Sequence, residues 1–161
     1  MELTVDQDLD ALTLTVTATF DHPVDKVWDL YADPRKFERW WGPPGAPATS
    51  IEHDLRAGGL VHYKMTIEGG QEHHGRWDVQ TVDEPRGFVV LDRFAHDDGS
   101  PNEEMPGTTM RFSFSPTDAG CQMVCVAEYS SREGLEQVVQ MGVIEGLKGS
   151  MGQMDAILAE G

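Results

Sequence analysis

Residues 12–41 read LTLTVTATFDHPVDKVWDLYADPRKFERWW, and the periodicity of this stretch changes twice. Apolar and polar residues alternate over 12–20, which predicts a strand with one buried face. Apolar residues then recur at helical spacing over 24–31, until Asp33 and Pro34 end that helix and begin a shorter one. The stretch therefore predicts one strand followed directly by two short helices.

Two adjacent tryptophans, Trp40 and Trp41, close the second predicted helix immediately before Pro43, Pro44 and Gly45. Adjacent residues of a helix point about 100° apart, so the two rings cannot serve the same purpose. We expect one ring to pack into the core as a plug and the other to face a cavity mouth or solvent. Phase alone leaves open which ring does which.

Beyond residue 47 the chain reads as a series of strands separated by short, turn-rich connections. Short connections favour an antiparallel meander, in which each strand pairs with the next. The six predicted strands span residues 48–55, 60–67, 72–82, 87–95, 107–115 and 121–130.

Residues 131–160 predict one long amphipathic helix, with Ser130 and Ser131 as its candidate N-caps. Val143, Leu147 and Met151 fall on one side of it at helical spacing. A second stripe consists of Gly142, Gly146 and Gly149, each costing up to about 1 kcal/mol relative to alanine in a helix interior. Such a stripe indicates either close backbone packing or room left for something else.

The order of these elements predicts an α+β fold in one domain, residues 1–161, with residues 1–11 as an N-terminal extension. A curved sheet of seven antiparallel strands would wrap around the long C-terminal helix, with the two short helices placed after the first strand. Curvature of this kind commonly leaves a cavity between sheet and helix.

The charge balance is strongly acidic, with 28 Asp and Glu against 12 Lys and Arg and a formal net charge of -16. This charge repels phosphate backbones and anionic lipids, so we expect no nucleic-acid partner. No apolar run is long enough to span a membrane and no leader pattern begins the sequence, which favours a cytoplasmic protein.

Cys121 and Cys125 would lie about 13 Å apart on one strand, too far for a disulfide.

Strand and helix phase nominate the side chains that would line the cavity. For any one of them, ordinary core packing remains the alternative interpretation. The predicted lining comprises Trp40, Trp41, Tyr63, Met65, His74, Trp77, Asp92, Met110, Phe112, Met123, Val143, Leu147 and Met151.

Polar residues in apolar phase are the candidates for chemistry, because burying one without a partner costs about 1 to 3 kcal/mol. Asp92 shares the phase of its apolar strand neighbours, and would be either an inward anchor or base or a paired structural carboxylate. Glu145, beside the glycine stripe, is a second such residue. His73 accompanies Trp77 inward by phase, unless a bulge at Gly75 places His74 there instead.

Other site chemistries have little support. No metal-ligand spacing is present, so we predict no metal and no cofactor. The sequence also lacks a nucleophile elbow and a phosphate-binding loop. This favours a binding protein over an enzyme without excluding an enzyme.

Four segments together resemble a known family: FDHPVDKVWDLYADPRKFERWWGPPG, EHDLRAGGLVHYKM, EHHGRWDV and MGVIEGLKGSMGQMDAILAE. The chain is similar to the START-like SRPBCC superfamily over about residues 12–158, and within it to the branch named after the activator of heat-shock protein 90 ATPase. The resemblance implies a helix-grip fold with a mostly apolar cavity. Many relatives carry tryptophan at the position of Val143, so valine there implies a larger or reshaped pocket.

Three functions remain open from the sequence. The leading hypothesis is a monomeric or dimeric carrier or sensor that binds a small hydrophobic or amphipathic molecule, lipid-like or aromatic and polyketide-like. The second is a cyclase or dehydratase in which Asp92 or His73 moves a proton. The third is a protein that docks on a chaperone ATPase through its acidic surface.

Overall fold

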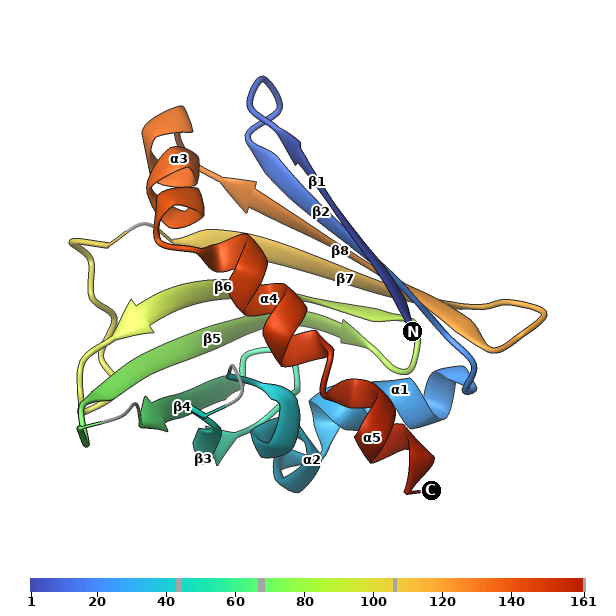
Figure 1. Ribbon diagram of the computed structural model, residues 1–161. Helices are drawn as coiled ribbons and strands as arrows, with labels where there is room; N and C mark the ends of the chain where they lie inside the picture. The colour runs from blue at the N-terminus through green and yellow to red at the C-terminus, as the bar shows by residue number, and fades with distance from the viewer. Residues whose placement is uncertain (43–44, 67–68, 106, 161) are drawn as a thin grey trace.

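The computed structural model describes residues 1–42, 45–66, 69–105 and 107–160. Its centre is an antiparallel sheet of eight strands that curves around helices on one face (Figure 1). The strands lie in the order β1-β2-β8-β7-β6-β5-β4-β3. Their bounds are β1 Glu2–Asp8, β2 Thr13–Phe20, β3 Ala48–His53, β4 Leu60–Thr66, β5 Glu72–Asp83, β6 Gly87–Ala95, β7 Thr108–Pro116 and β8 Cys121–Tyr129.

All seven predicted strands are present, and strand β1 adds an eighth within the segment predicted as an extension. It pairs with β2 along its whole length, from Glu2 opposite Thr19 to Asp8 opposite Thr13. Only Leu3 and Val5 of β1 pack against the core, and both remain partly exposed. A half-buried edge strand has a weak alternation of apolar residues, which is why the prediction was one strand short.

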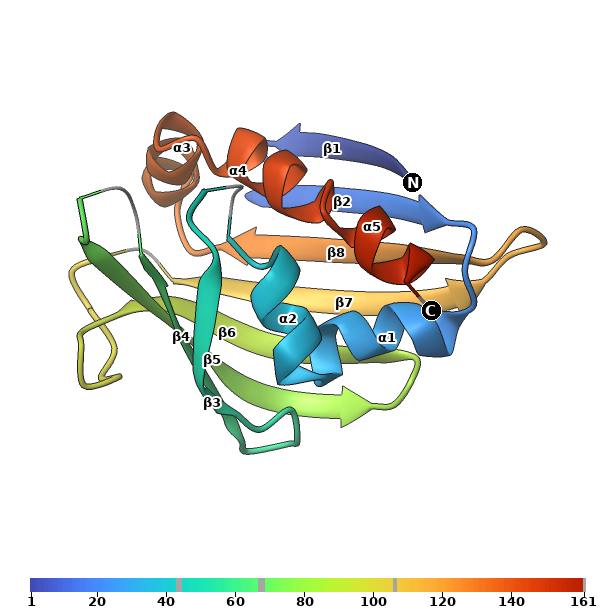
Figure 2. The ribbon, with the colours of Figure 1, turned by 60° about the horizontal axis from the view of Figure 1, so that its bottom comes forward.

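The two short helices form as predicted, as α1 (Val24–Ala32) and α2 (Pro34–Trp40). Asp33 separates them, because its backbone ends α1 while its carboxylate accepts a hydrogen bond from the Arg35 N–H at 2.9 Å. The helices pack an aromatic cluster against the sheet, with the Tyr31 ring 5.3 Å from Phe112 and 4.9 Å from Trp40. Figure 2 shows both helices on the concave side of the sheet.

The prediction of one long C-terminal helix was wrong. The segment divides into α3 (Arg132–Gln140), α4 (Val143–Met151) and α5 (Met154–Ala159). Gly142 adopts a left-handed conformation with φ of 89°, which a right-handed helix cannot continue through. Of the two candidate caps, Ser131 caps α3, because its hydroxyl accepts a hydrogen bond from the Gly134 N–H at 3.0 Å.

The break at Gly142 sets the position of α4, which lies across the concave face of the sheet in Figure 1. Helix α5 then lies beside α1 and α2 at the far end. Along the described parts of the chain, no helix is long and apolar enough to cross a bilayer.

Candidate functional site

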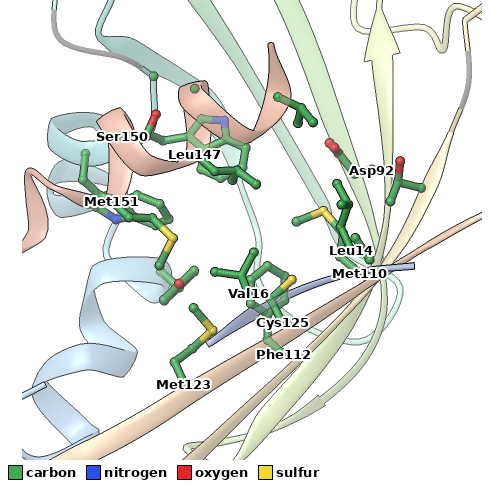
Figure 3. Close-up of a pocket in the computed structure, with 18 of the residues that line it drawn as sticks. Leu14, Val16, Asp92, Met110, Phe112, Met123, Cys125, Leu147, Ser150 and Met151 are labelled. Carbon is green, nitrogen blue, oxygen red and sulfur yellow. The ribbon is translucent and has the colours of Figure 1, made fainter. Parts of the chain in front are cut away.

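A cavity of about 270 Å³ lies between the concave face of the sheet and α4. We call it the inner cavity. Figure 3 shows Leu147, Ser150 and Met151 of α4 opposite side chains of the sheet. Ten of the thirteen predicted lining residues surround it: Trp40, Trp41, Met65, Asp92, Met110, Phe112, Met123, Val143, Leu147 and Met151.

A second cavity of about 250 Å³, the outer cavity, adjoins the first near the break between α3 and α4. Tyr63, His73 and Met141 are among its lining residues. The residues that line both cavities are Met65, Asp92, Thr108, Tyr129 and Val143. Asp92 therefore lies at the junction of the two spaces.

The two adjacent tryptophans differ in burial, and this difference shows which of them packs into the core. Trp40 is 1% exposed, and its indole N–H donates to the Leu30 carbonyl at 2.7 Å. Trp41 is only partly buried and stacks on Phe37 at 5.3 Å. Trp40 is thus the ring held in the core, whereas Trp41 keeps its own N–H without a described partner. Pro43 and Pro44, which follow them, lie outside the described residues.

Trp77 does not belong to the lining of either cavity. Its ring is fully buried and packs on Phe37 and Trp41, each 5.3 to 5.4 Å away. Strand phase correctly turned Trp77 to the concave side, but neighbouring rings cover it completely. For Trp77 the alternative of ordinary core packing was correct.

The two histidines of β5 face opposite ways. His73 is exposed at the rim of the outer cavity, on the same face of β5 as Gly75 and Trp77. His74 also borders that cavity, but its Nδ1 hydrogen bonds to Nε2 of His62 at 2.9 Å. Gly75 leaves space for Tyr63, because a Cβ there would come within 2.5 Å of the Tyr63 ring. No bulge is needed to explain this arrangement.

Asp92 resolves the ambiguity of strand β6, because its side chain faces the cavities from the inner face of the sheet (Figure 3). It pairs across the sheet with Trp77 of β5 and Thr108 of β7. The Tyr63 hydroxyl donates to its Oδ1 at a long 3.4 Å. Glu145, the other candidate carboxylate, is exposed on α4 and does not reach the cavity lining.

The surroundings of Asp92 disfavour its charged form. Desolvation by the surrounding protein raises the pKa of this carboxyl from 3.8 to about 7, against the opposing influence of the Tyr63 hydroxyl and the Trp77 indole. Trp41, which lines the inner cavity, has a buried indole N–H without a hydrogen-bond partner among the described residues. The junction of the cavities is thus a polar end in an otherwise apolar space.

Several lining residues were not in the predicted set. Leu14, Val16, Tyr31 and Ala127 share the buried phase of their elements, but phase does not separate cavity from core. Thr108 and Ser150 were not predicted, because they are polar and the lining was nominated from the pattern of apolar residues. Gly146 belongs to the glycine stripe, and the space beside it is open, since a Cβ at Gly146 would meet nothing within 4 Å. The glycine stripe had two explanations, close backbone packing or open space for another group. At Gly146 the second explanation is correct.

Nucleophilic and metal chemistry find no support in the geometry. Both cysteines are buried, and desolvation raises the pKa of the Cys121 thiol to about 11 and that of Cys125 further still. Among the described residues, no three His, Cys, Asp or Glu side chains are grouped as metal ligands. Asp92 remains the group in the inner cavity with chemistry near neutral pH.

Comparison with known proteins identifies close structural relatives. The family model described as Activator of Hsp90 ATPase homolog 1-like protein matches residues 21–159. The crystal structure of protein Ms6760 from Mycobacterium smegmatis is 47% identical, covers 98% of this chain and 97% of that one, and superposes with a TM-score of 0.90. A solution structure from Arthrobacter aurescens is 35% identical, covers 98% and 92% of the two chains, and gives 0.91. No curated protein sequence matches the chain.

Proposed function

The chain belongs to the family of activator of Hsp90 ATPase homolog 1-like proteins, whose fold commonly binds hydrophobic ligands, and from this we propose that it is a carrier or sensor of a small hydrophobic or amphipathic molecule. The observation that carries the proposal is the inner cavity of about 270 Å³. Its lining is mostly aliphatic, aromatic and methionine side chains, with Asp92 as the one Asp, Glu, Lys, Arg or His among them.

The composition of the lining suits ligands of variable shape. Met65, Met110, Met123 and Met151 all contribute to it, and unbranched thioether chains adapt to different partners. Lipid-like and aromatic molecules are therefore the ligand classes that we propose.

A cavity-filling substitution tests the proposal. Because nothing lies within 4 Å of a Cβ at Gly146, Gly146→Leu should occupy the inner cavity without backbone strain. We expect the wild type to bind the neutral fluorescent probe N-phenyl-1-naphthylamine, and Gly146→Leu to bind it at least tenfold more weakly with an undiminished free energy of unfolding.

Lys148→Leu is the matched control, since it adds the same side chain to the exposed face of α4 and should leave binding unchanged. Failure of the wild type to bind this probe or 1-octanol would contradict the proposal. So would equal binding by Gly146→Leu.

The cyclase or dehydratase alternative is supported at Asp92, whose carboxyl titrates near neutral pH inside the space where a substrate would lie. His73 offers less support, because it is exposed at the outer rim. Turnover of an aromatic polyketide that Asp92→Asn abolishes would favour this alternative over a carrier.

A further inference from the structure

Asp92 is a partly buried carboxyl without a compensating charge. It makes no ion pair with any residue that the structure describes, and the other residues lining the inner cavity carry no Lys, Arg or His. Arg93, its neighbour on β6, pairs instead with Asp78 at 2.6 Å. A charge shielded from water is stabilised by an opposite charge nearby, and the described residues of the inner cavity supply none for Asp92.

The surroundings of Asp92 suit a cation. The rings of Tyr31, Trp40, Trp41, Phe112 and Tyr129 line the same cavity, and the face of an aromatic ring attracts a positive charge. The Tyr63 hydroxyl contacts Oδ1 only, at 3.4 Å, so the carboxyl retains acceptor capacity for a ligand. The acidic protein as a whole, with its net charge of -16, also attracts cations and repels anions.

The inner cavity extends away from Asp92 along the strands of the sheet. Asp92 lies opposite Thr108, which in turn lies opposite Tyr129 of β8, whereas Met123 lies six residues earlier on β8. Six residues of a strand span about 20 Å, so the cavity extends from a polar end at Asp92 toward an apolar end at Met123 (Figure 3). A ligand with one polar head and one apolar tail matches this division.

We propose that the ligand of the inner cavity is a primary alkyl or arylalkyl amine, bound as the ammonium ion with its head on Asp92 and its apolar body toward Met123 and Met151. This inference rests on the proposed function, and it names the ligand class for the same cavity. The ammonium supplies a countercharge, and it keeps Asp92 ionised in a place where burial raises the pKa of the carboxyl to about 7.

Three probes of equal length test the proposal by calorimetric titration in phosphate buffer: octylamine, 1-octanol and octanoate. At pH 8 we expect octylammonium to bind at least tenfold more tightly than 1-octanol, and octanoate to bind most weakly. Asp92→Asn should bring octylammonium down to the affinity of 1-octanol while changing the 1-octanol affinity less than threefold. Retained 1-octanol binding also shows that the variant folds. Asp118→Asn, in an exposed turn, removes the same charge and should change neither affinity.

The pH dependence gives a second readout. Below about pH 7 the wild type must release the Asp92 proton to bind the ammonium, so its affinity for octylammonium should fall about tenfold per pH unit. The titratable and charged groups that line a cavity together with Asp92 are Tyr63 of β4, His73 and His74 of β5, Arg93 of β6, and Cys125 and Tyr129 of β8. From α4 the lining residues are not ionisable: Val143, Gly146, Leu147, Ser150 and Met151. His73→Asn should keep the pH profile, whereas Asp92→Asn should flatten it.

The outcomes separate the two proposals. If 1-octanol binds as tightly as octylammonium, or if Asp92→Asn leaves octylammonium binding unchanged, the amine assignment is wrong while the cavity proposal stands. If none of the three probes binds the wild type, both proposals fail.

Discussion

At the scale of single residues, Asp92 is the side chain whose ionisation matters most for the candidate site. Its phase on β6 placed it among apolar residues, but only the tertiary packing determines how strongly burial disfavours its charge and how far Tyr63 and Trp77 oppose this effect. Desolvation depends on atoms from distant parts of the sequence, so the sequence could nominate this carboxyl without giving its pKa.

The raised pKa of Asp92 predicts an unusual pH dependence of stability. The unfolded carboxyl loses its proton near pH 3.8, whereas the folded one keeps it until about pH 7. Between these values the folded state binds more protons, so the contribution of Asp92 to the free energy of unfolding falls as pH rises. We expect Asp92→Asn to gain about 2 to 4 kcal/mol relative to wild type between pH 4 and pH 8.

Urea denaturation of both proteins at each pH measures this difference, and all other titrating groups cancel between them. A stability difference that stays constant from pH 4 to pH 8 would show that the Asp92 carboxyl titrates normally in the folded protein.

At the scale of elements, the glycines of the C-terminal segment have different structural roles. Gly142 ends one helix and begins the next with a φ of 89°, whereas Gly146 lies inside α4 beside open space. Both fall in a continuous helical pattern of apolar residues, which explains why one long helix was predicted. The pattern of apolar residues does not report the backbone angle of Gly142. The break between α3 and α4 was therefore found only in the structure.

The same substitution should therefore have opposite effects at these two positions. Gly146→Ala should raise the free energy of unfolding by about 0.5 to 1 kcal/mol, because alanine is the better helix former. Gly142→Ala should lower it by about 1 to 2 kcal/mol, because a Cβ disfavours the left-handed conformation. Chemical denaturation of both variants measures the two changes. Stabilisation by Gly142→Ala would indicate that α3 and α4 join into one helix without cost.

On the scale of the whole molecule, the dominant feature is the unbalanced charge. Twelve Lys and Arg cannot pair with 28 Asp and Glu, so most of the formal charge of -16 repels itself in the compact state. Surface ion pairs such as Arg111 with Glu128 contribute little against this, since both side chains are about half exposed.

Screening this repulsion should stabilise the protein. We expect the melting temperature at pH 7.5 to rise between 0.05 M and 0.5 M NaCl, because the Debye length shortens from about 14 Å to about 4 Å. Near pH 4.5, where the sequence carries no net charge, the same salt increase should have little effect. A melting temperature that falls with salt at pH 7.5 would mean that specific ion pairs outweigh the net repulsion.

The sequence by itself determined the fold class, seven of the eight strands, both short helices and ten residues of the inner cavity. These follow from periodicity, turn residues and caps, which act between residues close in the chain. Tertiary structure alone decided that β1 joins the sheet, that Gly142 divides the last helix, that Trp40 rather than Trp41 is the core ring, and that Asp92 lies at the junction of two cavities. Each of these depends on which atoms of remote segments exclude water or leave space, and that information is not contained in any local pattern.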